Sequence, residues 1–192
     1  MNSLEFYIKK ISHSTGENID LSQIPMMMRR KLSPVGKIAL STLLQCYDGD
    51  DVKLTYASRF GELERVVKLI KQEHEENEIS PIGFSFSVHN STIGLFSLTN
   101  KIHSPYNSIS AGENSFCLGL LESAMNKVKT LFCYAESVDR FESISMLIDY
   151  DGQGEHVRII PNTQNLEPNN FTEFIKGGQY ICPLYIMERV ND

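Results

Sequence analysis

The sequence predicts an α/β fold in which a mixed sheet is covered by helices on both faces. Short β-prone runs alternate along the chain with segments whose apolar residues recur at helical spacing. That alternation is typical of a sheet sandwiched between helices. At 192 residues and 41% hydrophobic composition, the chain can also bury one sizeable core. We therefore expect a single domain over residues 1–192.

Three regular elements are expected in the first part of the chain, after an irregular start. A helix is predicted over residues 33–47, because a serine N-cap and a first-turn proline precede apolar residues on one face. Residues 52–57 alternate as in a strand. Residues 58–78 predict an amphipathic helix, since apolar residues fall at i, i+3, i+4 and i+7. These residues are Leu63, Val66, Val67 and Ile70.

The middle of the chain is less regular at first. Residues 84–100 are apolar but interrupted by Ser, Asn and Gly, which is typical of a winding buried segment. A strand over 106–110, a helix over 116–124 and a strand over 131–135 are then predicted from their periodicity.

The end of the chain is expected to add further strands. Residues 144–149 and 157–160 read as strands joined through a Gly-Gln-Gly turn, and residues 161–170 form a polar loop by composition. The apolar segment 180–190 predicts a last strand, in which Pro183 favours an edge or a bulge.

Composition excludes some classes of partner. The formal net charge is −6, from 18 basic and 24 acidic residues, which argues against nucleic acid or an anionic membrane as the main partner. No stretch reaches the ~20 apolar residues that a membrane span needs, and the first residues lack the apolar core of a signal peptide. We expect a cytoplasmic protein.

The four cysteines give no sign of a metal site. Cys46, Cys117, Cys133 and Cys182 are widely spaced, with no CxxC pair and no nearby histidines, so neither a zinc site nor a disulfide framework is indicated. We expect them to be reduced and mostly buried.

Residues 108–125, SISAGENSFCLGLLESAM, resemble the strand, tight turn and helix on which many enzymes expose a nucleophile. The tip of this turn is Glu113, which is either a functional carboxylate or a first-turn residue that complements the helix dipole. From the residues alone the second interpretation is favoured. Cys117 falls on the apolar stripe of the helix, so we expect it in the core.

Two other features have both a functional and an ordinary interpretation. Ser115 and His89 could form a hydrolase pair, but the turn lacks the glycine frame of G-x-S-x-G. The basic run Arg29, Arg30 and Lys31 could dock an anionic carrier protein, or it could simply be a solvated helix start.

Several motifs together resemble the β-ketoacyl synthases of the thiolase fold, over about residues 25–136. RRKLSPVGKIAL and ASRFGELER are similar to the family's early helix and its first strand-to-helix turn. SPIGFSFSVHNSTIGLFS is similar to a ketosynthase-like N-terminal domain of aryl polyene clusters. The run that leads to the family's active-site cysteine is matched by Asn90, Gly94, Pro105, Ser108, Ile109 and Ser110.

The resemblance implies a thiolase-like fold of approximately the N-terminal half only, with residues 137–192 as a divergent tail. In this register Glu113 stands where the family has its nucleophilic cysteine. A condensing enzyme also uses two histidines from its C-terminal half, which the resemblance does not reach. The resemblance therefore implies an inactive subunit, similar to the chain-length factor of type II polyketide synthases, and it implies no cofactor or metal.

The same resemblance implies partners and positions. A chain-length factor pairs with an active ketosynthase, helps to shape the acyl tunnel in polyene or polyketide biosynthesis and works with an acyl carrier protein. The strand expected to pair antiparallel with the partner comprises Tyr106, Asn107, Ser108, Ile109 and Ser110. The residues expected to shape the tunnel are Ile82, Gly83, Phe84 and Phe86.

Two alternatives remain open at this point. The chain could be a homodimeric ketosynthase-like module that binds acyl chains or carrier protein, or a small acyl-thioester hydrolase using Ser115 with His89, or Cys117 with a distant histidine. Because a half-fold leaves part of its sheet uncovered, we also expect this chain to be poorly soluble alone.

Overall fold

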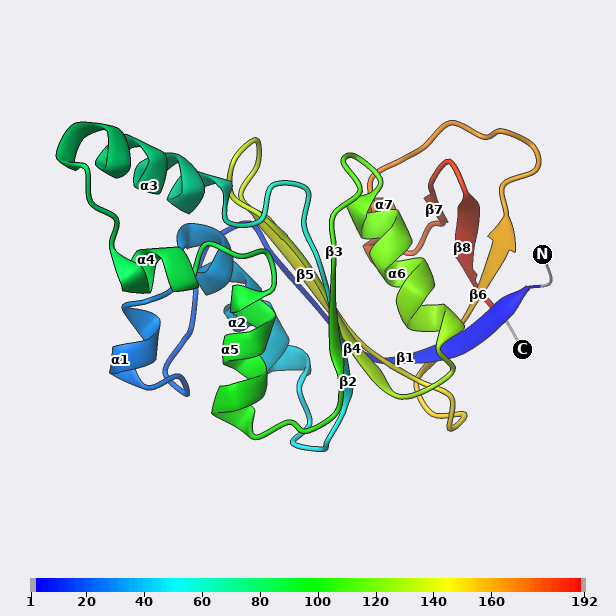
Figure 1. Cartoon of the computed structure of the whole chain (residues 1–192). Coiled ribbons are helices and arrows are strands. Elements are labelled where there is room, and N and C mark those ends of the chain that lie inside the picture. Colours follow the sequence, from blue (N-terminus) through cyan, green and yellow to red (C-terminus); the bar gives the residue numbers. More distant parts are fainter. Residues whose placement is uncertain (1–2, 191–192) are drawn as a thin grey trace.

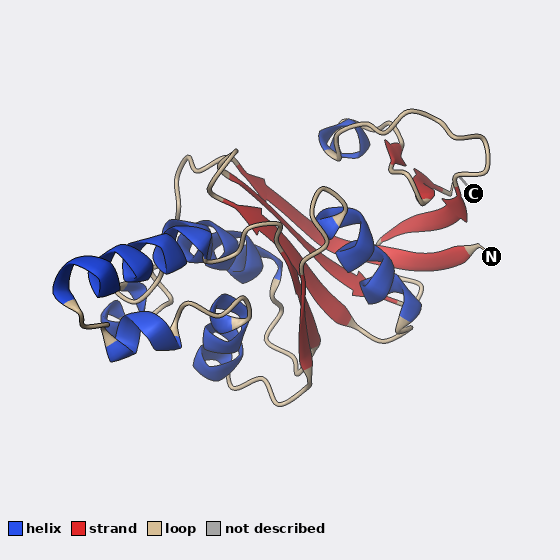
Figure 2. Cartoon of the chain, turned by 45° about the horizontal axis from the view of Figure 1, so that its top comes forward, coloured by secondary structure: helices blue, strands red, loops and turns tan. Residues whose placement is uncertain are grey.

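The computed structural model describes residues 3–190, and in this part of the chain it has one mixed eight-stranded sheet with helices on both faces (Figures 1 and 2). The strands are β1 (Leu4–Ser14), β2 (Lys53–Ala57), β3 (Tyr106–Ile109), β4 (Thr130–Glu136), β5 (Glu142–Asp149), β6 (Glu155–Pro161), β7 (Tyr180–Ile181) and β8 (Tyr185–Arg189). The helices are α1 (Met26–Arg29), α2 (Pro34–Cys46), α3 (Leu63–Glu76), α4 (Pro81–Ser85), α5 (Ser91–Asn100), α6 (Ser115–Met125) and α7 (Thr172–Ile175).

The strand order is β3-β2-β4-β5-β1-β6-β8-β7, so β3 lies at one edge of the sheet. Strand β2 pairs in parallel with β3 and β4, whereas the remaining neighbours pair antiparallel. The mixed sheet expected from the sequence is therefore confirmed.

Strand β4 shows how the sheet separates two cores. Leu131 and Cys133 pack into the core beneath α2 and α5, while Phe132 and Tyr134 pack into the core beneath α6. Side chains alternate across a strand, so a strand buried on both faces must be apolar at nearly every position. Both faces of the sheet are covered at β4, as predicted for the sheet.

Helix α2 begins as its sequence dictates. The Ser33 hydroxyl accepts a hydrogen bond from the backbone N–H of Gly36 at 3.1 Å, and Pro34 occupies the first helical position. This serine cap satisfies one of the N–H groups that a helix start leaves free.

The start of the chain was wrongly predicted as irregular, because β1 is the longest strand and lies inside the sheet between β5 and β6. Phe6 and Ile8 are buried, but the pairing with β5 shifts between Ile8 and Lys10. Such a bulge interrupts the two-residue period that would have identified a strand.

The prediction of a winding buried segment over 84–100 was also wrong. Helix α4 has no buried residue, and α5 is a regular ten-residue helix. The apolar and small residues of α5 are spread around the helix, so no amphipathic period marks it.

The final segment forms two strands rather than one. Strands β7 and β8 make a hairpin whose turn contains Pro183, and β7 lies at the sheet edge opposite β3. The short helix α7, which the sequence did not predict, precedes it.

Candidate functional site

The turn between β3 and α6 carries Glu113. Gly112 adopts φ +58°, a left-handed conformation that glycine tolerates best, and Asn114 is the N-cap of α6. Glu113 thus lies before the helix and not in its first turn, which corrects the first-turn interpretation. Its side chain is 71% exposed and forms an ion pair with the Arg59 guanidinium.

Arg59 lies in the loop that follows β2 and is held in place by residues at and just after the end of β4. Its guanidinium lies 4.5 Å from the centre of the Phe60 ring and 3.4 Å from the Asp139 carboxylate. Its backbone N–H donates to the buried carboxylate of Glu136, whose pKa is raised by burial. Glu113 is therefore a surface carboxylate paired with an arginine whose loop is held in place.

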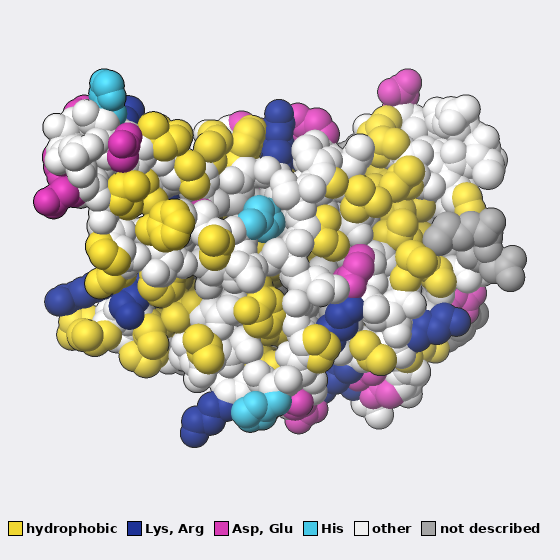
Figure 3. Space-filling view, viewed as in Figure 1, with side chains coloured by type: hydrophobic (Ala, Val, Ile, Leu, Met, Phe, Trp, Pro, Cys, Tyr) yellow, Lys and Arg dark blue, Asp and Glu magenta, His cyan; other side chains and the backbone are white. Residues whose placement is uncertain are grey.

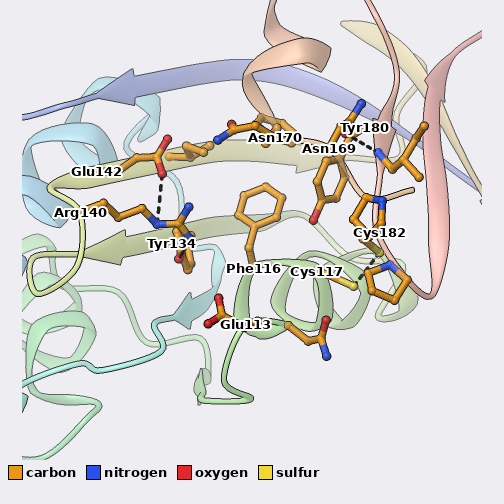
Figure 4. A pocket seen from close by; sticks show the side chains of 16 residues that line it. Glu113, Phe116, Cys117, Tyr134, Arg140, Glu142, Asn169, Asn170, Tyr180 and Cys182 are labelled. Atoms are coloured by element: carbon orange, nitrogen blue, oxygen red, sulfur yellow. Dashed lines mark hydrogen bonds and ion pairs between the residues drawn. The ribbon is translucent and has the colours of Figure 1, made fainter. Parts of the chain in front are cut away.

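A cavity of about 370 Å³ opens beside this turn (Figure 4). Helix α6 contributes Phe116 and Cys117, and the C-terminal segment contributes Phe171, Tyr180 and Cys182. Phe116 packs edge-on against Tyr180 at 5.2 Å and tilted against Phe171 at 4.8 Å. Aromatic side chains from residues 137–192 thus close over the helix that follows the turn.

The structure does not join Ser115 to His89 through a hydrogen bond. The Ser115 hydroxyl donates to the Gly112 carbonyl at 2.7 Å and accepts from the Ala111 N–H at 2.9 Å. The ring of His89 contacts the Ser58 carbonyl at 3.0 Å. Ser115 bonds within its own turn and His89 bonds to the loop after β2, so the two side chains do not form a nucleophile and base pair.

All four cysteines are free and buried, as expected. Cys117 faces the core, where its sulfur contacts that of Cys182.

A second site is a groove of about 530 Å³ between α3, α4 and the segment after α1. Two of the predicted docking residues, Arg30 and Lys31, line it, whereas Arg29 does not. Ile82 and Gly83 of the predicted tunnel segment line the same groove. The groove also contains Arg65, Lys68 and Lys71 of α3.

Sequence reasoning missed these α3 cations. They lie on the polar side of a helix whose apolar period dominated the interpretation, and charges on such a face are usually only solvated. Only the fold brings them beside Arg30 and Lys31, which are more than 30 positions away in the sequence.

Helix α4 and its C-cap residue Phe86 present the candidates for the tunnel wall. Ile82 is 62% and Phe84 is 64% exposed, while Phe86 is half-buried beneath the Lys31 ammonium at 5.6 Å. Ser80 caps this helix by accepting from the Gly83 N–H at 3.1 Å. Apolar side chains gather over the α3, α4 and α5 side of the molecule (Figure 3).

The predicted pairing strand is an edge strand. Tyr106 and Asn107 are exposed, Ser108 and Ile109 are half-buried, and β3 pairs only with β2 among the described residues. Ser110 lies past the strand end, where its hydroxyl donates to the Arg59 carbonyl at 3.1 Å.

Residues 3–190 contain no cluster of three or more side chains that could hold a metal ion. No helix in this range is long and apolar enough to span a membrane.

The fold defines the class of protein first. The fold of this chain is similar to that of a chain in the structure of the ketosynthase (ApeO) in complex with its chain length factor (ApeC) from Xenorhabdus doucetiae. The TM-score is 0.75 and the sequence identity is 21%, and the match covers 97% of this chain and 100% of that chain. It is also similar to the ishigamide ketosynthase/chain length factor, with a TM-score of 0.61 and 13% identity over 78% of this chain and 55% of that chain.

A third similar structure is AntDE:AntF, a type II polyketide synthase acyl-carrier protein in complex with its ketosynthase bound to the hexaketide. Here the TM-score is 0.62 and the identity 9%, over 78% of this chain and 64% of that chain. The fold is thus thiolase-like, as the sequence predicted.

The family follows from the sequence match. A family model described as the N-terminal domain of β-ketoacyl synthase matches residues 8–131, which is more than half of the chain. The chain belongs to this family. No curated protein matches it by sequence.

Proposed function

We propose that this protein is a non-catalytic, chain-length-factor-like subunit that pairs with an active ketosynthase and helps to shape its acyl tunnel. The observation that carries the proposal is Glu113, an exposed and ion-paired carboxylate at the turn where the family resemblance puts the nucleophilic cysteine. A carboxylate cannot carry the acyl chain as a thioester, so condensation requires a cysteine on the partner. We place its action in the cytoplasm.

The edge strand β3 supports the proposed pairing. An edge strand leaves backbone N–H and C=O groups free on one side, and a partner strand can satisfy them. We propose that Tyr106 to Ser110 meet the antiparallel counterpart in the ketosynthase. The exposed side chains of Ile82 and Phe84, together with Gly83 and Phe86, are then the proposed contribution to the tunnel wall.

The basic groove supports a docking role for the carrier protein. Arg30 and Lys31 stand beside Lys68 and Lys71, with apolar Ile82 at the groove wall. Carrier proteins of this class are the expected acidic partner, and a groove lined by five basic and two acidic residues, with an apolar residue at its wall, favours such a partner. Arg29 does not line the groove, so we propose that it contributes only a positive charge beside it.

We also propose that residues 137–192 belong to the same domain as the family-matched part. The support is that β5, β6, β8 and β7 continue one sheet with β4 and β1, and that Phe171 and Tyr180 pack on α6.

The test is co-expression with a ketosynthase encoded beside this chain, followed by size-exclusion chromatography with light scattering. We expect a one-to-one complex that makes polyene chains from malonyl-loaded carrier protein, and no product from either chain alone. Phe84→Ala should lengthen the product. A homodimer of this chain beside a ketosynthase that works alone would contradict the proposal and favour the homodimeric alternative, in which β3 pairs with a second copy.

A charge-reversal experiment tests the groove separately. Lys68→Glu with Lys71→Glu should raise the KM for carrier protein at least tenfold without breaking the complex. Lys176→Glu, at the C-cap of α7, is the matched control, because it reverses an exposed charge outside the groove. An unchanged KM in the α3 variant would remove the groove from the proposal.

A further inference from the structure

Cys117 and Cys182 bring two thiols into contact across the cavity wall. Their sulfur atoms lie 2.7 Å apart, although the residues are 65 positions apart in sequence. Both residues are free, and each is 2% exposed. Cys117 belongs to α6, and Cys182 lies in the turn between β7 and β8 (Figure 4).

The backbone around both cysteines is held by hydrogen bonds. The Tyr185 hydroxyl donates to the Cys117 carbonyl at 3.0 Å, and the Cys182 N–H donates to the Tyr185 carbonyl at 2.9 Å. The Asn162 side-chain amide donates to the Cys182 carbonyl at 3.0 Å. One tyrosine thus ties the two segments together, and the sulfurs need only a small approach to reach the ~2.0 Å of a covalent bond.

The cavity gives a small oxidant a path to the pair. Both cysteines line the cavity of about 370 Å³, and the exposed Glu113 lies at its wall. A thiol that is buried from bulk solvent but borders a cavity of this size remains reachable by a molecule as small as a hydroperoxide.

The pair also differs electrostatically from the other two cysteines. The hydrogen bond from the Cys117 thiol lowers the pKa of Cys182 below its ordinary value, against the opposing effect of burial. Burial raises the pKa of Cys46 to about 12 and that of Cys133 to about 11. Because the thiolate is the reactive form, Cys182 is the thiol best prepared for attack.

We propose that Cys117 and Cys182 are an oxidation site at which a hydroperoxide converts two thiols into a disulfide. The Cys182 thiolate attacks the peroxide oxygen, so the O–O bond breaks and a sulfenic acid forms, with hydroxide or alkoxide leaving. The Cys117 thiol then attacks the Cys182 sulfur and displaces water. Two thiols are oxidised, and one hydroperoxide is reduced to an alcohol or water plus water.

The bond would lock the C-terminal segment onto α6. It would close a loop spanning the 65 positions between the two cysteines and fix the β7–β8 hairpin against the helix that follows Glu113. A cross-link of this span restricts the unfolded chain, so the oxidised protein should unfold at a temperature roughly 10 °C higher.

The test treats the full chain with a small excess of hydrogen peroxide and then blocks the remaining thiols for peptide mass mapping. We expect the loss of two hydrogen atoms, a single linked peptide pair that joins Cys117 to Cys182, and reversal by dithiothreitol. Cys182→Ala and Cys117→Ala should each abolish the linked pair and the rise in unfolding temperature. Cys133→Ala is the matched control, since it removes a buried cysteine from the opposite face and should leave both results unchanged.

The peptide mass map of the oxidised wild-type protein tests the proposal even if a variant fails to fold. Unmodified thiols, a linkage through Cys46 or Cys133, or oxidation of Cys182 to a sulfinic acid without a linked peptide would each overturn the proposal. A linked pair with no rise in unfolding temperature would overturn the claim that the bond fixes the C-terminal segment.

Discussion

At the scale of single residues, Glu113 combines a special position with an ordinary environment. It occupies the tip of a turn held open by Gly112, yet its carboxylate is largely exposed and paired with Arg59. An exposed ion pair contributes little to stability, since solvent screens the attraction and two long side chains lose freedom. The ion pair of Glu113 with Arg59 is therefore expected to contribute little to the stability of the chain.

The first prediction follows from that exposure. Glu113→Gln should change the free energy of unfolding of the chain by less than about 1 kcal/mol, as measured by urea denaturation. Glu113→Cys should give no condensation product with carrier protein in the absence of a ketosynthase. Product formation by the cysteine variant alone would mean that the site keeps the rest of a catalytic apparatus.

Gly119 gives a second residue-level prediction. A Cβ added there would lie 2.7 Å from the Ala57 Cβ and 2.8 Å from the Phe132 ring, where α6 crosses the sheet. Gly119→Ala should therefore lower the free energy of unfolding by about 1–3 kcal/mol, despite the better helix propensity of alanine. Gly94→Ala in α5 is the control, because its nearest atom is the movable end of Tyr106 at 3.3 Å. Equal stability of the two variants would contradict the close packing of α6.

At the scale of elements, the carboxylate of Glu122 joins α6 to the edge of the sheet. It accepts hydrogen bonds at 2.7 to 2.8 Å from side chains of β2, β3 and the end of α6. The donors are Lys53, Thr55, Asn107 and Asn126. Because Asn107 belongs to β3, this network also positions the strand proposed to pair with the ketosynthase.

The network predicts a pH-dependent stability. Burial alone would raise the pKa of Glu122, but the hydrogen bonds hold it below its ordinary value of 4.5. A lowered pKa in the folded state stabilises the fold at higher pH, and this stabilisation is lost as the pH falls through the folded-state pKa. Glu122→Gln should therefore cost about 1–2 kcal/mol at pH 7 and progressively less below 4.5.

Urea denaturation at several pH values measures this effect. The exposed loop variant Glu167→Gln serves as the control, since it removes one carboxylate outside the network. A cost for Glu122→Gln that stays constant down to the acid limit would show that the charge of Glu122 contributes nothing.

Some helices and strands could be predicted from the sequence and others could not. Helices α2, α3 and α6 could be predicted because each has a clear apolar period or a cap. Strand β1 could not, since a bulge near Lys10 breaks its alternation, and α5 could not, since its apolar residues have no preferred side. The turn at Glu113 could be predicted from adjacent residues, whereas the approach of Cys182 to Cys117 depends on a hairpin at the far edge of the sheet that reaches α6.

At the scale of the whole molecule, one exposed surface is rich in large apolar side chains. Large side chains stand out from α3, α4, α5 and the segment that joins α4 to α5, on one side of the molecule (Figure 3). They are Ile70, Ile82, Phe84, Val88 and Leu98. A monomeric protein seldom leaves so many neighbouring elements with exposed apolar side chains, and such a patch marks an interaction surface or an aggregation liability.

The last prediction separates these two consequences of the patch. Replacing Ile82 and Phe84 together by serine should reduce aggregation of the isolated chain, seen as less concentration-dependent light scattering, because two exposed apolar side chains of α4 are removed. The same change should weaken association with the ketosynthase at least tenfold, since exposed aromatic and aliphatic anchors supply most of the energy of an interface. The control is Leu166→Ser, a less exposed leucine in the loop before α7, which should alter neither result. Because α4 has no buried residue, the free energy of unfolding should stay within about 0.5 kcal/mol of the original value. Reduced aggregation with unchanged affinity would assign the patch to self-association alone and remove α4 from the proposed tunnel wall.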